Sequence, residues 1–144
     1  MAIFAPDTSC MVAKLVVTHE HHERAVAALD RHFDAGDRMV IVAHTLLEAY
    51  ASLTTIPRPH RIAPDAAWRA LRETFVARGT IVALRAEDYE QLISDLATAG
   101  TIGGQVYDAS IVECARLAGV DVLLTFNERH FRRFEGNGLT IEVP

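Results

Sequence analysis

Residues 105–131 constrain the fold of this chain more than any other stretch. Apolar residues recur at helical spacing after Asp108, and Gly119 stands where a glycine commonly ends a helix. The apolar run at residues 120–124 follows at once and is typical of a strand buried on both faces of a parallel sheet. A helix that leads directly into such a strand predicts an α/β fold.

Four other short apolar segments have the length and pattern of strands, and amphipathic helical segments separate them. We expect strands at residues 2–5, 39–43, 80–84 and 139–143. We expect helices at residues 11–17, 19–35, 45–54, 64–78 and 86–99, with a further one starting at Asn127. The alternation predicts a single domain over residues 1–144. Its architecture would be a Rossmann-like, three-layer α/β/α sandwich around a mostly parallel sheet of about five strands.

Composition excludes several classes of protein. The 144 residues are half hydrophobic, without an apolar run that could span a bilayer, and the N-terminus lacks the basic start of a signal peptide. We therefore expect a cytoplasmic protein without a membrane partner. A net charge of −5 argues against a general nucleic-acid coat protein but allows an enzyme with a local basic patch. Cys10 and Cys114 form no Cys-x-x-Cys pair, so we expect free, buried thiols.

Three carboxylates stand where this topology collects functional groups. Asp7 follows the first strand, Glu48 lies in the helix after the second, and Asp108 begins the helix before the fourth. Thr125 and Asn127 follow that fourth strand. Sites in open α/β sheets lie at the carboxyl ends of strands, so these groups converge if the three strands are neighbours. Oxygen ligands of this kind suit Mg²⁺ or Mn²⁺.

Each of these residues also has a possible local role. Asp7 can cap the helix that follows it, and Thr45 with Glu48 matches a capping box. Asp108 is favourably placed against a helix dipole, and Asn127 is a plausible N-cap. Their joint placement after successive strands favours a shared site over four independent caps.

At these residues the chain resembles a known family, the PIN domain, and within it the VapC-like toxins of bacterial type II toxin–antitoxin pairs. The resemblance runs from the first strand to the last. Its matching segments are Asp7-Thr8-Ser9, Glu48 within HTLLEAYASLT, Asp108 within YDASIVECARLAG, and LLTFNERHF at residues 123–131.

The resemblance implies a Mg²⁺- or Mn²⁺-dependent endoribonuclease with Asp7, Glu48 and Asp108 as its acidic triad. It implies a supporting hydroxyl from Ser9 or Thr125, an antitoxin protein as partner and a homodimer. In the family the position of Asn127 holds Asp or Asn, and an amide there keeps an oxygen ligand without its charge.

The chemistry of RNA cleavage assigns roles to these residues. A bound cation would activate a water molecule and stabilise charge on the phosphoryl oxygens. We expect Asp7 and Asp108 to be direct ligands, and Glu48 to be a ligand or a general base acting through water. Asn127 and Thr125 would orient ligands or a metal-bound water.

Two other functions stay open at this point. The first is a catalytically degenerate PIN domain that binds RNA or protein, which the intact acidic triad argues against and Asn127 weakly favours. The second is a Rossmann-like phosphatase, but such enzymes place a second Asp two residues after the first, and this chain has Ser9 there.

Basic and histidine-rich segments complete the candidate surface. Arg58 and Arg61 in a proline-rich loop, and Arg129 and Arg132 beside Asn127, could contact RNA phosphates. We interpret His19, His21 and His22 as a solvated helix start rather than a metal site. Trp68, Leu71 and Phe75 share one helix face and are expected in the core or in a partner groove.

Overall fold

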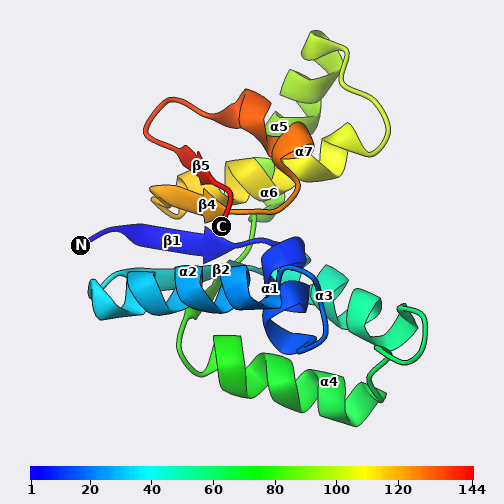
Figure 1. Ribbon diagram of the computed structural model, residues 1–144. Coiled ribbons are helices and arrows are strands. Elements are labelled where there is room, and N and C mark those ends of the chain that lie inside the picture. The colour runs from blue at the N-terminus through cyan, green and yellow to red at the C-terminus, as the bar shows by residue number, and fades with distance from the viewer.

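The five strands form one sheet in which every pairing is parallel. The computed structural model describes all residues from Met1 to Pro144. The strands are β1 (Ile3–Pro6), β2 (Arg38–Val42), β3 (Thr80–Val82), β4 (Val122–Leu124) and β5 (Thr140–Glu142). They lie in the order β3-β2-β1-β4-β5 (Figure 1). The prediction of a parallel sheet of about five strands is confirmed.

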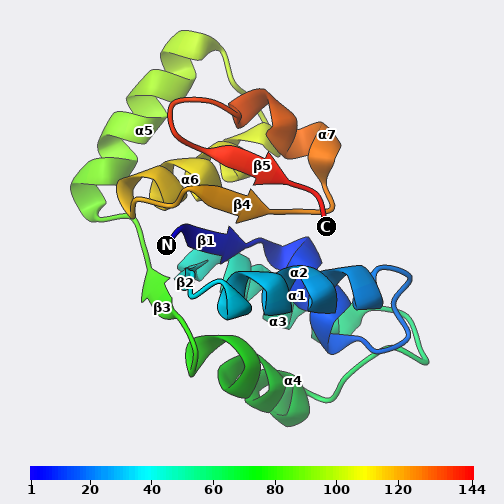
Figure 2. The ribbon, with the colours of Figure 1, turned by 60° about the vertical axis from the view of Figure 1, so that its left-hand side comes forward.

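Helices cover both faces of the sheet, which confirms the three-layer sandwich (Figures 1 and 2). On one face lie α1 (Thr8–Leu15), α2 (His22–Asp34), α3 (Ala43–Thr55) and α4 (Pro64–Leu71). On the other lie α5 (Ala86–Ala99), α6 (Gln105–Leu117) and α7 (Glu128–Phe131).

Alternation along the strands divides the buried residues into two cores. In β1, Phe4 packs into the core under α1, α2 and α4, while Ala5 faces the core under α6. In β2, Met39 and Ile41 join the first core, and Val40 and Val42 join the second. Side chains that alternate in this way follow from the period of two of an extended strand. The central strands β1 and β2 are therefore buried on both faces, whereas the edge strand β3 is mostly exposed.

Some helix boundaries differ from those expected. The helix predicted from His19 begins at His22, because residues 17–21 form a turn. The helix after Pro64 is α-helical only to Leu71 and continues as a π-helix, η1 (Arg72–Val76). Helix α6 begins at Gln105, so Asp108 lies inside its first turn rather than at its start.

The helix face with three large apolar residues divides between core and surface. Leu71 and Phe75 are buried, so they belong to the core. Trp68 keeps 43% of its surface exposed and is the member of the three that a partner can reach.

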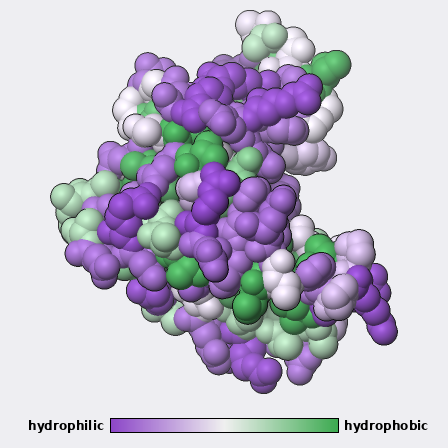
Figure 3. Space-filling view, viewed as in Figure 1, coloured by the Kyte–Doolittle hydropathy of each residue, from purple (hydrophilic) through white to green (hydrophobic).

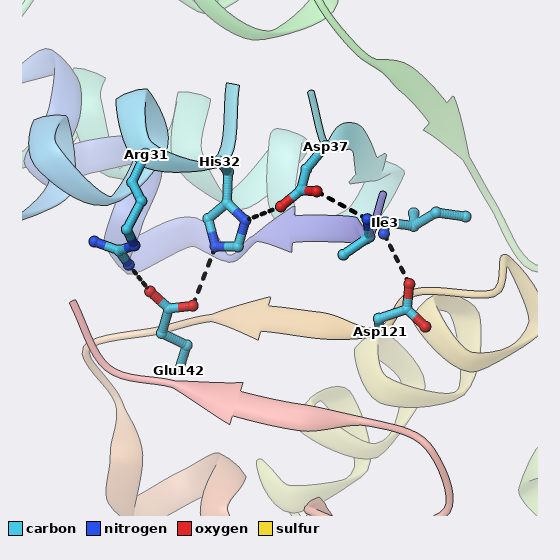
Figure 4. A network of polar contacts seen from close by, with 7 residues as sticks. Ile3, Arg31, His32, Asp37, Asp121 and Glu142 are labelled. Atoms are coloured by element: carbon cyan, nitrogen blue, oxygen red, sulfur yellow. Dashed lines mark hydrogen bonds and ion pairs between the residues drawn. The ribbon is translucent and has the colours of Figure 1, made fainter. Parts of the chain in front are cut away.

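A polar network fastens the two ends of the chain across one face of the sheet (Figure 4). His32, at the end of α2, is buried and stacks on Phe4 with ring centroids 4.5 Å apart. Its Nδ1 lies 2.7 Å from Oδ2 of Asp37, and its Nε2 lies 3.1 Å from Oε2 of Glu142, which also pairs with Arg31. The other oxygen of Asp37 accepts the backbone N–H of Ala2. The network thus joins the start of β1 to the last strand.

No helix has the length and apolar character needed to cross a membrane. The face of the molecule seen in Figure 3 is mostly hydrophilic, with small hydrophobic patches between the polar residues. Helix α5 contributes to the exposed apolar surface because none of its residues is buried, and Tyr89 and Ile93 are its exposed large apolar residues.

Candidate active site at the carboxyl edge of the sheet

The sheet order brings the residues that follow three neighbouring strands to one edge. Strand β1 lies between β2 and β4, so the residues after these three strands meet at the same end of the sheet. The expectation that the strands are neighbours is confirmed.

Asp7 is the most constrained carboxylate at this edge. It is only 2% exposed, and it caps α1 by accepting the backbone N–H of Cys10 at Oδ1 (3.0 Å). The Ser9 hydroxyl donates to the same oxygen (2.6 Å), and the Thr125 hydroxyl donates to Oδ2 (2.6 Å). The local cap expected of Asp7 is present, and Ser9 and Thr125 both supply the supporting hydroxyls that the resemblance implies.

Burial and hydrogen bonding act on Asp7 in opposite directions. Desolvation raises the pKa of its carboxyl above the usual value, and the hydrogen bonds from Ser9, Thr125 and Cys10 reduce that rise. These donors contact both oxygens of the carboxylate and so fix its orientation. A bound cation would offset the cost of burying the charge.

Glu48 lies in α3 and is connected to Asp7 through the start of α1. The Thr8 hydroxyl is 3.3 Å from Oε2 of Glu48 and also donates to the backbone carbonyl of Thr45 (3.0 Å). The predicted capping box is wrong, because α3 begins at Ala43 and the Thr45 hydroxyl donates back to Val42. With no capping role, the side chain of Glu48 is free for another function.

His44 contacts Glu48, and sequence reasoning missed this contact. Its Nε2 lies 2.6 Å from Oε1 of Glu48, at an angle too poor for a hydrogen bond, and has no other polar partner. The imidazole is parallel to the exposed ring of Tyr107, with centroids 5.8 Å apart. The spacing of four residues between His44 and Glu48 on a helix was the available signal.

Asp108 lies in the first turn of α6, and its side chain is 18% exposed. Its Oδ2 is 3.3 Å from Nδ1 of His130, a second histidine contact that sequence reasoning missed. Asp108 and His130 come from segments that meet only in the folded chain, so no sequence spacing indicates this pair.

A pocket of about 470 Å³ opens in front of Glu48 and Asn127. Thr8 and Ser9 form part of its lining, and so do His19 and His21. His21 stacks on Phe126 with ring centroids 4.5 Å apart. The interpretation of the histidine segment as a freely solvated helix start is therefore incomplete, because two of its rings form a wall of this pocket.

The carboxylates are not gathered into a preformed ligand cluster. No three Asp, Glu, His or Cys side chains lie close enough together to hold a metal ion. Asp7 and Glu48 are linked through Thr8 and Ser9, whereas Asp108 lines a neighbouring hollow. The donor chemistry fits Mg²⁺ or Mn²⁺ because these groups offer oxygen atoms.

Asn127 is the N-cap residue of α7, but its side chain makes no capping hydrogen bond. Its backbone N–H donates to the Thr125 hydroxyl (2.9 Å), which in turn donates to Asp7. Asn127 thereby fixes the hydroxyl that contacts the buried carboxylate, while its own amide lines the pocket.

The predicted RNA-contacting arginines differ in their surroundings. Arg132 donates to Glu128 (2.7 Å), Glu135 (2.7 Å) and the backbone carbonyl of Ile141 (2.9 Å), so its charge is already matched. Arg129 has no carboxylate partner and lines the hollow beside Asp108. Arg58 and Arg61 line a separate hollow of about 490 Å³.

Comparison with known families decides the classification. The family model described as PIN domain matches residues 4–137, which is nearly the whole chain. This chain belongs to the PIN domain family. The PIN domain family is the one that the Asp7, Glu48 and Asp108 motifs resemble, and its match begins in β1 and ends beyond α7.

Curated relatives and solved structures agree with this membership. This chain is 37% identical over 141 residues to Ribonuclease VapC40 of Mycobacterium tuberculosis, and the alignment covers 98% of each chain. It is 39% identical over 111 residues to Ribonuclease VapC27 of the same species, covering 77% of this chain and 75% of the relative.

Two solved structures share the fold. DNA-bound VapBC from Salmonella typhimurium has a TM-score of 0.64 at 26% identity, with 98% of each chain covered. The sarcin-ricin loop cleaving toxin VapC20 of Mycobacterium tuberculosis has a TM-score of 0.67 at 19% identity, covering 92% of this chain and 95% of its own.

Proposed function

We propose that this PIN domain is a metal-dependent endoribonuclease of the VapC kind that hydrolyses RNA phosphodiester bonds. The observation that carries the proposal is the buried carboxylate of Asp7, held at the sheet edge by the hydroxyls of Ser9 and Thr125 and the N–H of Cys10. Its support from outside the chain is the similarity to Ribonuclease VapC40 over almost the full length of both proteins.

Each residue at the carboxyl edge of the sheet would have a separate role in the reaction. Asp7 and Asp108 would hold Mg²⁺ or Mn²⁺, which when bound lowers the pKa of water and stabilises charge on phosphoryl oxygens. Ser9 and Thr125 fix the orientation of the Asp7 carboxylate, and Asn127 fixes Thr125. Glu48, which is partly exposed and has no capping role, would take the proton from the attacking water.

The similar proteins also support a proposal for the binding partners of this chain. Solved structures with the same fold include VapBC assemblies from Salmonella typhimurium and Rickettsia felis, both bound to DNA. We propose a cognate antitoxin for this chain, a homodimeric toxin and action in the cytoplasm. An acidic protein with net charge −5 would meet RNA through its local arginines rather than through its overall charge.

Cleavage of RNA with defined metals tests this function. Structured and single-stranded RNAs are incubated with the protein in Mg²⁺, in Mn²⁺ and in EDTA, beside Asp7→Asn and Asp108→Asn. Asp34→Asn is the matched control, because Asp34 is exposed and has no polar partner. We expect cleavage that needs metal, is lost in the first two variants and is kept in the third. Undiminished cleavage in EDTA would overturn the mechanism.

The same variants separate a catalytic PIN domain from one that only binds RNA. A binding module would retain RNA affinity in metal and cleave nothing in any condition. Asp108→Asn is especially informative, because its side chain is not a cap of α6. We expect it to remove activity and leave the thermal midpoint of the metal-free protein unchanged or raised.

A further inference from the structure

A polar hollow borders Asp108 at the N-terminal turn of α6. It encloses about 340 Å³ and is lined by five residues, none of them hydrophobic: Gln105, Asp108, Arg129, His130 and Arg133. This volume is several times the roughly 30 Å³ that a water molecule takes in the liquid, so a hydrated phosphate group fits.

We propose that this hollow binds a backbone phosphate of the RNA next to the scissile one, and that Arg129 and Arg133 hold that phosphate together. The proposal rests on the ribonuclease function proposed above. Asp108 belongs both to the proposed metal site and to the lining of the hollow. A phosphate bound here therefore lies next to the one at the metal.

The charges around the hollow favour an anion. Arg129 and Arg133 have no ion pair, whereas Arg132 between them is held by Glu128 and Glu135. The lining contains two guanidinium groups without ion pairs and one carboxylate, that of Asp108. Its net charge is therefore positive even when His130 is neutral. Guanidinium groups match the geometry of phosphate oxygens and bind them with two parallel hydrogen bonds.

Neighbouring residues position the Arg133 side of the hollow before a ligand arrives. The guanidinium of Arg133 lies over the ring of Phe134, 4.5 Å from its centroid. Arg116 donates to the backbone carbonyl of Phe134 (2.7 Å) and ties this segment to α6. Gln105 adds amide donors at the first residue of α6, where the helix dipole also favours an anion.

A carboxylate of an acidic protein segment presents similar chemistry to arginine. The composition of the hollow favours RNA, because the buried centre of a protein interface is rich in apolar residues and this lining has none. Asp108 also favours RNA as the ligand, because this residue belongs both to the hollow and to the site where RNA would be cleaved.

The salt dependence of RNA binding tests the proposal. The probe is a labelled single-stranded RNA of random sequence and about 20 nucleotides. Binding is followed by fluorescence anisotropy in Mg²⁺ between about 50 and 200 mM salt, with Glu48→Gln in every protein to prevent cleavage. The variants are Arg129→Gln, Arg133→Gln and both together. Arg38→Gln is the matched control, since Arg38 is exposed at the opposite edge of the sheet.

We expect each single variant to weaken binding about three- to tenfold at low salt. The double variant should reduce the slope of log affinity against log salt by about 0.7, the value for one phosphate on a single strand. The control should match the unaltered protein, and all thermal midpoints should agree within about 2 °C, as for other surface substitutions.

Three results would overturn the proposal. The first is an RNA affinity of the Arg129 and Arg133 variants equal to that of the control. The second is a slope reduced by about 1.4 in the double variant, which indicates two separate phosphates. The third is unchanged RNA affinity with lost binding of a polyglutamate peptide, which would assign the hollow to a protein carboxylate. In each case cleavage by the unaltered protein shows whether the ribonuclease function itself still stands.

Discussion

The hydroxyl of Thr125 donates a 2.6 Å hydrogen bond to Asp7, although the two residues lie 118 positions apart in the chain. Thr125 follows β4 and Asp7 follows β1, so the parallel pairing of these strands brings the two side chains together. Both are fully or almost fully buried. The carboxylate proposed to hold the metal is thus positioned by the sheet itself rather than by a flexible loop.

Replacing Thr125 tests this support. Thr125→Val keeps the shape but removes the hydrogen bond to a buried carboxylate, a loss of about 1.5–3 kcal/mol. We expect a thermal midpoint lower by roughly 4–10 °C and, because outer-shell partners tune metal sites, activity lower by about 10- to 100-fold. Thr125→Ser retains the hydroxyl and should restore most of both. A fully active Thr125→Val protein would contradict the role of this hydroxyl.

Glu48 gives a second test, because the structure removes its expected structural role. Its helix starts at Ala43 without a side-chain cap, so Glu48→Gln should leave the thermal midpoint within about 2 °C of the unaltered protein. As the proposed general base it should lower the turnover rate by about 100-fold or more. Glu73→Gln, an acidic residue in η1, is the control. A large loss of stability in Glu48→Gln would favour a structural role after all.

The sequence was sufficient to predict the architecture, since apolar runs of four or five residues between amphipathic segments specify a parallel sheet with covered faces. It also nominated Asp7, Glu48 and Asp108 as site residues. Asp7 and Glu48 follow the neighbouring strands β1 and β2, whereas Asp108 lies in the helix before β4. The contacts of His44 and His130 with two of these carboxylates were not predicted. The spacing of four residues on α3 is a signal for the His44–Glu48 contact. The His130–Asp108 contact depends on how α6 and α7 are placed beside each other, and no periodicity indicates that placement.

The difference between Arg132 and its neighbours has the same origin. In the sequence, nothing distinguishes Arg129, Arg132 and Arg133, which lie within five residues of one another. In the folded chain Arg132 forms ion pairs with Glu128 and Glu135. Arg129 and Arg133 instead line the hollow beside Asp108. Which arginines of a cluster form ion pairs depends on the exact direction of each side chain around the helix, and the sequence alone does not predict it.

Reactivity of the thiols tests the expected burial of the two cysteines. Burial, and then the charges of Asp88 and Glu113, raise the pKa of Cys114 to about 11. Burial raises the pKa of Cys10 as well. At pH 8 only about one Cys114 in a thousand is thiolate, so a thiol reagent should modify neither residue in the native protein. Both should react after unfolding in guanidinium chloride. A thiol that reacts quickly in the native protein would contradict the burial.

Metal affinity should depend on pH through Asp7. Burial raises the pKa of this carboxyl above the usual value, and a metal ligand must be deprotonated. In the metal-free protein the raised pKa means that stability is lost as pH rises through it, and bound metal should reverse this trend. We expect Mn²⁺ affinity, measured by calorimetry, to rise with pH through the acid range. An affinity independent of pH there would contradict Asp7 as a ligand.

Stability in acid should depend on Asp37, through the network around His32. The hydrogen bond from the N–H of Ala2, and then that of His32, lower the pKa of the Asp37 carboxyl. A lowered folded-state pKa gives stability that is present above the unfolded value of about 3.9 and is lost as pH falls through the folded value. Asp37→Asn should therefore lower the thermal midpoint by a few degrees at pH 7, and the difference should shrink towards zero at the acid end. Asp34→Asn, three residues earlier and without a polar partner, should match the unaltered protein throughout. Equal midpoints for Asp37→Asn at pH 7 would show that the network of Figure 4 does not fasten the chain ends.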